Sequence, residues 1–337
     1  MSDKIRWGII GTGSIAHKFA EGLKSAKNAE LVAVGSRSAE TANKFGDEFG
    51  VPRRYDSYGK LAADGDVQAV YISTPHPMHK DNSIVCLEAG KAVLCEKPFT
   101  INAKEASKVI EVAGERKVFL MEAMWTRFLP VMVKLRQLLA DKAIGKVRML
   151  QADFGFRATF NPLSRLFNPK LGGGGLLDVG VYPISLANMI FGDEPEQVFS
   201  LAEIGWTGID EQAAMILGYH GNSQLAVLAT GVRTSTPQQA TIIGTDGTIT
   251  IPSWWHGQEM TLTANGQTQQ IPCPMEGNGY NYEADEVARC LEAGLLESDV
   301  MPLAGTLAVM NVMDEMRMQW KMTYPGERHG RFGKASR

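Results

Sequence analysis

Two short segments carry side chains that could move a proton beside a bound ligand. Lys97 follows an apolar run that ends at Glu96, while Asp178 and Tyr182 follow four glycines at residues 172–175. Asp178 and Tyr182 are four residues apart, so a helix would present both on one face. A lysine ammonium about 4 Å from a tyrosine favours the phenolate by roughly 4 kcal/mol, or about three pKa units before desolvation. These side chains are therefore candidates for acid–base chemistry, whereas a surface lysine, a capping aspartate and a core tyrosine form the alternative.

A second group of residues is suited to holding a dinucleotide. The apolar run 5–10 ends in a glycine turn, and a helical pattern follows. Gly11 permits a tight turn, Gly13 lets the backbone approach a pyrophosphate, and Ala16 keeps the helix close to the sheet. The N–H groups at the helix start suit phosphate oxygens, and the preceding strand supplies the required context. The predicted contacts in this turn are Gly11, Thr12, Gly13, Ser14 and Ile15.

The end of the second predicted strand indicates which dinucleotide is bound. NAD sites usually place an acidic residue here, for the ribose 2′-hydroxyl. This chain has Ser36 and Arg37 instead, a hydroxyl and a guanidinium that suit a 2′-phosphate. We therefore expect NADP in preference to NAD, with a solvated surface role for Arg37 as the alternative.

The elements that must position these residues alternate between strand and helix in the first 120 residues. Such alternation predicts βαβ units and a Rossmann-type, doubly wound parallel sheet. The predicted strands are 5–10, 30–34, 67–73, 92–95 and 118–121, and the predicted helices are 14–27, 38–49, 79–89 and 103–116.

Strand patterns of period two dominate after residue 145, with Asp-Gly and Asn-Gly turns between neighbours. They predict a second α+β domain built on a large, mostly antiparallel open sheet. We place the dinucleotide-binding domain at residues 1–122 and the substrate-binding and oligomerisation domain at 123–337, whose helix 302–320 could pack back on the first. The strands are 147–156, 197–204, 212–219, 223–230, 239–244, 248–251 and 260–264, with helices 174–191, 281–293 and 302–320.

Composition narrows the class of protein. The chain has 337 residues, 44% of them hydrophobic, and a formal net charge of −3. It shows no footprint for nucleic acid or a membrane surface, and its N-terminus has no secretory pattern. Its four cysteines have no paired short spacing. We expect a cytoplasmic protein with reduced cysteines.

The glycine turn, Glu96-Lys97-Pro98 and the glycine-rich Asp178…Tyr182 segment resemble, in this order and spacing, the glucose–fructose oxidoreductase/inositol dehydrogenase (Gfo/Idh/MocA) family. The resemblance runs from Lys4 to about Tyr324. Residues 121–128 look most like the branch of dimeric dihydrodiol dehydrogenases and NADP-dependent D-xylose 1-dehydrogenases. Many inositol dehydrogenases have histidine where this sequence has Tyr182, which favours the sugar/dihydrodiol branch.

The resemblance implies roles for individual positions. Lys97 would be the catalytic lysine, Tyr182 the general acid/base, and Asp178 a partner that orients the lysine or the substrate. The loop after the third strand would lie beside the nicotinamide, with His76 facing the substrate. Two histidines without a third clustered ligand are a weak zinc signal, so we expect no metal. The further predicted cofactor contacts are Ser36, Arg37, Thr74, Pro75, His76, His79, Glu96 and Lys97.

Aromatic and arginine side chains are the remaining pocket candidates. Trp125 directly follows the last strand of the first domain and is the best aromatic candidate. Adjacent Trp254 and Trp255, if on a strand, would face opposite sides, so that at most one enters the pocket. The sequence does not decide whether Arg127 and Arg165 contact a substrate or a partner subunit. The predicted substrate contacts are His76, Trp125, Arg127, Phe154, Asp178 and Tyr182.

The function predicted from the sequence is NADP-dependent hydride transfer at a carbinol carbon of a small sugar, polyol or trans-dihydrodiol. The alternatives are a non-catalytic NADP-sensing protein and a transhydrogenase that holds NADP tightly. Several strands of the second domain are apolar on more than one face, which predicts a homodimer or larger homo-oligomer built on that sheet. The sequence leaves the individual substrate, the physiological direction and the strictness of NADP preference open.

Overall fold

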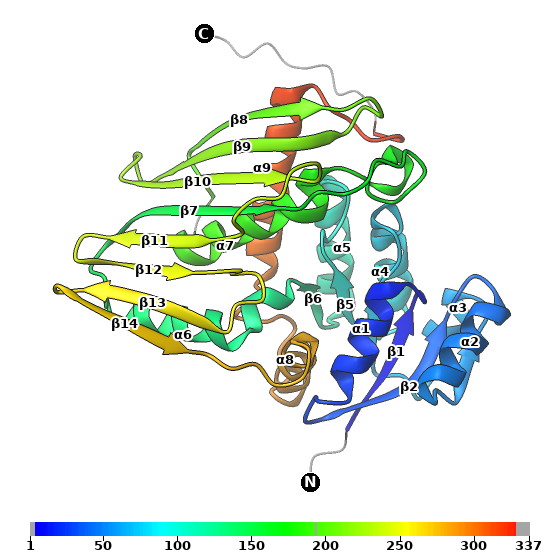
Figure 1. Ribbon diagram of the computed structural model, residues 1–337. Helices are drawn as coiled ribbons and strands as arrows, with labels where there is room; N and C mark the ends of the chain where they lie inside the picture. The colour runs from blue at the N-terminus through cyan, green and yellow to red at the C-terminus, as the bar shows by residue number, and fades with distance from the viewer. Residues whose placement is uncertain (1–3, 193, 328–337) are drawn as a thin grey trace.

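The computed structural model describes residues 4–192 and 194–327, which form two separate sheets (Figure 1). The first has the order β3-β2-β1-β4-β5-β6 with every pairing parallel, so the predicted doubly wound sheet is confirmed. The short, polar strand β3 was not predicted. The strands are β1 (Ile5–Ile10), β2 (Ala29–Gly35), β3 (Arg53–Tyr55), β4 (Ala69–Ile72), β5 (Ala92–Glu96) and β6 (Leu120–Ala123).

Helices connect these strands, and local caps fix where several of them begin and end. The side chain of Ser38 accepts a hydrogen bond from Thr41 N at the start of α2, which ends at Gly50 with φ +68°. The side chain of Asn102 caps the helix that begins at Ala103 in the same way, by accepting a hydrogen bond from Glu105 N. The helices are α1 (Ser14–Leu23), α2 (Ala39–Phe49), α3 (Tyr58–Ala62), α4 (His79–Glu88) and α5 (Ala103–Arg116).

The second sheet has eight strands in the order β14-β13-β12-β11-β7-β10-β9-β8. Only the central β7–β10 pair is parallel, so the predicted mostly antiparallel sheet is confirmed. The polar strand β14 was not predicted. The strands are β7 (Val147–Gly155), β8 (Gln197–Ile204), β9 (Asp210–Tyr219), β10 (Gln224–Gly231), β11 (Ala240–Gly244), β12 (Gly247–Ile251), β13 (Glu259–Ala264) and β14 (Gln267–Pro272).

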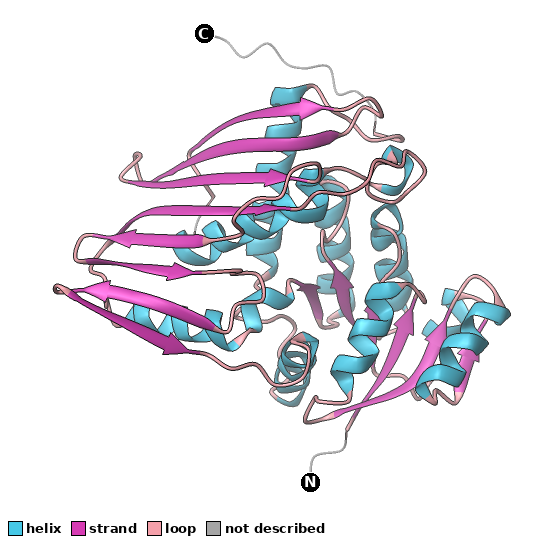
Figure 2. Cartoon of the chain, viewed as in Figure 1, coloured by secondary structure: helices cyan, strands magenta, loops and turns pink. Residues whose placement is uncertain are grey.

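Helices cover one face of the second sheet and leave the other open (Figure 2). Helix α7 (Val181–Phe191) packs on β7 and β10, and α9 (Leu303–Trp320) packs on β8. On the open face, one row of paired residues runs through Phe199, Ile216 and Val227, all exposed. The remaining helices in this half are α6 (Pro130–Ala140), which was not predicted, and α8 (Tyr280–Glu292).

Helix α9 also packs against α5 and β6 of the first half. Thr306 Oγ1 donates to Glu122 Oε2 at 3.0 Å, and Asp314 Oδ2 accepts from Ala103 N at 2.9 Å. The exact division after residue 122 stays a prediction, and residues 1–3, 193 and 328–337 of the two expected domains lie outside the described residues.

The stretch Pro169–Phe191 is long and apolar enough to cross a membrane by length and composition. However, 89% of its most apolar window is buried inside the protein, and a core helix passes the same test.

Candidate active site

The glycine turn lies where β1 meets α1, and its geometry requires glycine at the first position. Gly11 has φ +100°, and a Cβ there would lie 2.8 Å from Ser73 Oγ at the end of β4. At Gly13 a Cβ would meet no atom within 4 Å, so open space adjoins the backbone. No side chain caps the start of α1, which leaves its first N–H groups free to bind an anion.

A single cavity of about 520 Å³ extends from this turn to the second half of the chain. Every residue predicted to contact the cofactor lines it, as do Asp178 and Tyr182. A larger cavity between α4, α5 and the end of α9 contains none of these residues. The lining residues are Gly11, Thr12, Gly13, Ser14, Ile15, Lys18, Ser36, Arg37, Tyr58, Ser73, Thr74, Pro75, His76, His79, Glu96, Lys97, Arg165, Asp178 and Tyr182.

Lys97, Asp178 and Tyr182 meet in this cavity, although 81 residues separate the first two. Lys97 Nζ donates a 2.8 Å hydrogen bond to the backbone oxygen of Asp178 and lies 4.0 Å from its carboxylate Oδ1. The same Nζ lies 4.7 Å from the centroid of the Tyr182 ring. All three side chains are largely buried, so water screens their charges only weakly.

Burial and opposite charge compete in this set. Burial opposes the charge of Lys97, but Tyr182 and Asp178 together raise its pKa. Burial also opposes the charge of Asp178, yet Lys97 and Arg165 lower its pKa below the usual carboxyl value. Lys97 and Asp178 therefore form a charged pair at neutral pH.

The pKa of Tyr182 moves opposite to the effect we assigned to the lysine. Burial raises it above the usual value, and the charge of Lys97 only partly offsets this. The position of the lysine limits this offset. The ammonium lies over the ring and gives a hydrogen bond to Asp178, so its charge does not act at the phenol oxygen alone. Desolvation of the buried phenol, which works against the lysine, is the larger effect.

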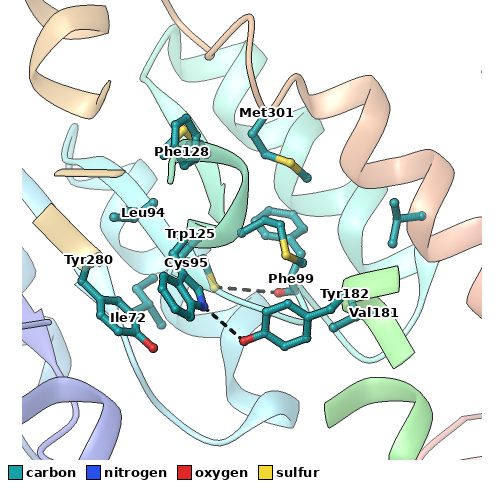
Figure 3. Packing of buried hydrophobic residues seen from close by; sticks show 14 of the residues in the cluster. Ile72, Leu94, Cys95, Phe99, Trp125, Phe128, Val181, Tyr182, Tyr280 and Met301 are labelled. Atoms are coloured by element: carbon teal, nitrogen blue, oxygen red, sulfur yellow. Dashed lines mark hydrogen bonds between the residues drawn. The ribbon is translucent and has the colours of Figure 1, made fainter. Parts of the chain in front are cut away.

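Aromatic side chains hold the hydroxyl of Tyr182 in place (Figure 3). Trp125 Nε1 donates to the Tyr182 oxygen at 3.2 Å, and the Trp125 ring stacks on Tyr280 at 4.8 Å. Phe154 meets the tyrosine ring edge-on at 5.2 Å. The phenol oxygen thus accepts from one fixed donor, which leaves its own O–H free to donate.

The four glycines let the chain enter a wide π-helical turn, η4 (Leu176–Gly180), that precedes α7. Asp210 at the start of β9 lies beneath this turn, where its Oδ2 accepts from Leu176 N at 2.6 Å. Gly174 has φ +124°, and a Cβ there would run into the Asp210 carboxylate. Such turns recur at functional sites, and this one carries Asp178.

The two histidines of the predicted nicotinamide loop are fixed by backbone carbonyls. His76 Nδ1 lies 2.9 Å from Gly172 O and therefore carries the proton, so Nε2 is an acceptor. Burial, followed by His79, holds the pKa of His76 well below its usual value, so the ring is neutral. Both nitrogens of His79 face carbonyls, Pro98 O at 2.9 Å and Thr74 O at 2.7 Å. His79 thus joins the loop after β4 to the segment after β5.

Arg127, predicted to contact the substrate, does not line this cavity. Its guanidinium is buried and donates to Ser185, Asn188 and Val300 O. Arg127 lies on η2 (Trp125–Phe128), a tight helical turn shortly after β6. Successive side chains of such a turn point in different directions. Trp125 reaches Tyr182 in the first turn of α7, whereas Arg127 reaches Ser185 and Asn188 further along the same helix.

Trp254 and Trp255 lie in a turn after β12, so the condition that both are on a strand is not met, and neither lines the cavity. Their rings both contact Phe154, with centroids 6.4 and 4.9 Å away. Sequence reasoning missed Lys18, Tyr58 and Ser73 among the lining residues and left Arg165 undecided. Lys18 had a signal, since it lies one helical turn after Ser14, and so had Ser73, which ends the predicted strand 67–73.

No group of three or more His, Cys, Asp or Glu side chains in residues 4–192 and 194–327 could hold a metal ion. The cavity is better matched to a dinucleotide. An open glycine turn, an uncapped helix start and the Ser36–Arg37 pair lie along one side, and the lysine–tyrosine pair lies along the other.

Comparisons with known proteins cover both halves of the chain. Residues 5–124 match the oxidoreductase family with an NAD-binding Rossmann fold, and residues 132–250 match the GFO/IDH/MocA C-terminal domain. The trans-1,2-dihydrobenzene-1,2-diol dehydrogenase of Xenopus tropicalis is 39% identical, over 95% of this chain and 99% of that protein. The mouse protein of the same name is 38% identical, over 96% and 99%.

Solved structures share the fold. An aldose–aldose oxidoreductase from Caulobacter crescentus, complexed with glycerol, superposes with a TM-score of 0.87 at 22% identity, over 94% of this chain and 98% of that one. A 3-ketoreductase from Actinomadura kijaniata, in complex with NADP and TDP-benzene, has a TM-score of 0.84 at 24% identity and the same coverage.

Proposed function

This chain belongs to the GFO/IDH/MocA family of oxidoreductases, and from that membership we propose that it is an NADP-dependent dehydrogenase of trans-dihydrodiols or of related sugars and polyols. The observation that carries the proposal is the meeting of Lys97, Asp178 and Tyr182 in the cavity that also contains the glycine turn. The dihydrodiol dehydrogenases at 34–39% identity make dihydrodiols the first substrates to test.

In this proposal the first half of the cavity holds the cofactor. The N–H groups at the start of α1 bind the pyrophosphate, and Ser36 and Arg37 bind the 2′-phosphate. Arg37 is exposed. Burial raises the pKa of Tyr58, and the charge of Arg37 offsets part of this rise. The two side chains therefore lie close together at the adenosine end. When bound, NADP supplies the acceptor for a hydride.

Tyr182 exchanges the proton of the reacting hydroxyl, and Lys97 stabilises the phenolate that oxidation requires. Asp178 holds Lys97 through its backbone oxygen and its carboxylate. Because burial raises the pKa of Tyr182, the phenol is protonated at neutral pH. It is thus ready to act as an acid in carbonyl reduction, whereas alcohol oxidation should speed up as pH rises and the phenolate becomes populated.

The decisive test is Tyr182→Phe, assayed with NADP and trans-dihydrodiols, sugars and polyols. We expect turnover to fall by about 10²–10⁴-fold, with NADP affinity kept. Tyr219→Phe is the matched control, because it removes the hydroxyl of a buried tyrosine on β9 that does not line the cavity. Near-normal turnover in Tyr182→Phe would overturn the acid–base assignment. NADP binding without turnover of any substrate in the wild type would instead indicate an NADP-sensing protein.

We also propose that the open face of the second sheet joins two copies of the chain. Exposed Phe199, Ile216 and Val227 lie side by side across β8, β9 and β10, and Leu201 on the same face of β8 is 82% exposed. An apolar surface of this kind is typical of a protein interface. We also propose that the protein is cytoplasmic. Its four cysteines are free and buried, as is usual in a reducing compartment.

A further inference from the structure

Arg165 reaches the catalytic cavity from the segment between β7 and α7. Its Nη1 donates a 2.7 Å hydrogen bond to Asp178 Oδ1 and lies 3.4 Å from Nε2 of His76. Because that histidine nitrogen is an acceptor, both neighbours attract the same guanidinium nitrogen. Arg165 is thus anchored at one corner of its planar head.

The rest of the guanidinium is free. An arginine has five N–H donors, and Nε and Nη2 of Arg165 have no hydrogen-bond partner among the described residues. The side chain is 48% exposed and lines the cavity together with Lys97 and Tyr182. An anchored head with unused donors in a ligand cavity is arranged to bind oxygen atoms of the ligand.

The position of Arg165 relative to Lys97 indicates which oxygen it would bind. Lys97 Nζ lies 4.0 Å and Arg165 Nη1 lies 2.7 Å from the same atom, Asp178 Oδ1. The distance between the two nitrogens therefore cannot exceed the sum of these two distances. A hydroxyl bound beside Lys97 and Tyr182 therefore has its neighbouring carbon's oxygen within reach of Arg165. A substrate with one isolated hydroxyl has no second oxygen for Arg165 to bind.

We propose that Arg165 binds the substrate oxygen adjacent to the reacting carbinol and thereby selects vicinal diols over isolated alcohols. The inference rests on the proposed function and deepens it, since it names the substrate group that the cavity recognises. Arg165 is a specificity-determining residue, and the proton chemistry stays with Tyr182 and Lys97.

The experiment compares Arg165→Met and Arg165→Lys on trans-cyclohexane-1,2-diol and cyclohexanol at saturating NADP. Arg165→Met should lower kcat/KM for the diol by about tenfold or more, mainly through KM, because it removes a hydrogen bond from a charged donor. Activity on cyclohexanol should fall clearly less than activity on the diol, because cyclohexanol loses only the support that Arg165 gives to Asp178. Arg165→Lys should restore part of the preference for the diol. Arg157→Met, an exposed arginine of the same segment, is the matched control.

Three results would overturn the proposal. Equal losses on both substrates would show that Arg165 acts only by holding Asp178. A loss of NADP affinity, measured by fluorescence titration, that accounts for the effect would make Arg165 a cofactor contact. An unchanged preference in Arg165→Met would remove it from the site.

Binding in a catalytically silenced enzyme separates this proposal from the function on which it rests. The diol is titrated by calorimetry into Tyr182→Phe loaded with NADP, and into the same protein carrying Arg165→Met. Diol binding that weakens with Arg165→Met supports the inference even if no diol is ever oxidised. Diol oxidation by the wild type, with binding indifferent to Arg165, would refute the inference and leave the function intact.

Discussion

The two sheets supply the cavity in different ways. The parallel sheet contributes loops at the carboxyl ends of its strands, with Gly11 after β1, Ser36 after β2, Thr74 after β4 and Lys97 after β5. The second sheet contributes none of its own strand ends there. It supports a π-helical turn and a helix on its covered face, and these carry Asp178 and Tyr182.

The difference lies in what fixes the positions of the side chains. In a doubly wound sheet, strand ends and helix starts form a ligand crevice through the topology itself. A helix on a covered sheet face has no such general role, so the positions of Asp178 and Tyr182 depend on particular contacts. Asp210, at the start of β9, supplies one of them.

The strongest test asks whether the two regions form one catalytic unit. Lys97→Met removes the charge from the first region, and Tyr182→Phe removes the hydroxyl from the second. Each should lower kcat by about 10²–10⁴-fold, and the double variant should be little worse than the worse single one, because residues that act together are not additive. Losses that multiply in the double variant would mean that the regions contribute independently.

Asp210→Asn tests the support beneath the π-helical turn through the pH dependence of stability. Burial raises the pKa of Asp210 to about 7. A carboxyl that titrates near 4 in the unfolded chain then favours the folded state at acid pH, and this contribution of up to about 4 kcal/mol is lost as pH rises through 7.

The amide that Asp210→Asn introduces cannot ionise, but its oxygen can still accept from Leu176 N. The free energy of unfolding should therefore fall less steeply between pH 4 and 8 than it does in the wild type. Urea unfolding across that range measures the slope, with exposed Asp141→Asn as the control. Identical slopes for Asp210→Asn and the wild type would exclude Asp210 as the titrating group.

Arg37→Asp tests the first region alone. A hydrogen bond to a charged group is worth about 1.5–3 kcal/mol, so NADP affinity should fall by about tenfold or more while NAD is relatively favoured. Fluorescence titration with both cofactors measures this. Lys44→Asp on α2 makes the same change of charge on a neighbouring exposed site and should leave the preference unaltered. NADP affinity equal to that of the wild type would refute the role assigned to Arg37.

Leu201→Lys tests the open face of the second sheet and should have the smallest effect on activity. A charge in the apolar part of this face should shift a dimer towards monomer, as light scattering would measure, with NADP affinity kept. Thr261→Lys lies on the polar part of the same face, on β13, and should not alter the molar mass. A wild type that is monomeric at micromolar concentration would contradict the proposed interface.

The strands that sequence reasoning found carry a clear apolar pattern, and the two strands that it missed lack one. Strands β4, β5 and β6 are buried along their whole length and read as apolar runs. Strands β3 and β14 are short or polar, and their pairing with a neighbour makes them strands. Trp254 and Trp255 lie in the turn after β12, between the predicted strands 248–251 and 260–264.

The sequence by itself determined the fold class, the family and the residue types of the site. These depend on local patterns: a glycine turn between a strand and a helix, a lysine after a strand, and a tyrosine one turn after an aspartate. Only the tertiary structure decided that Arg165 lies in the cavity and Arg127 outside it, that His76 is a neutral acceptor, and that burial outweighs Lys97 at Tyr182. The physical reason is that side-chain direction, burial and charge at a site come from residues far apart in the chain, and desolvation depends on all of them together.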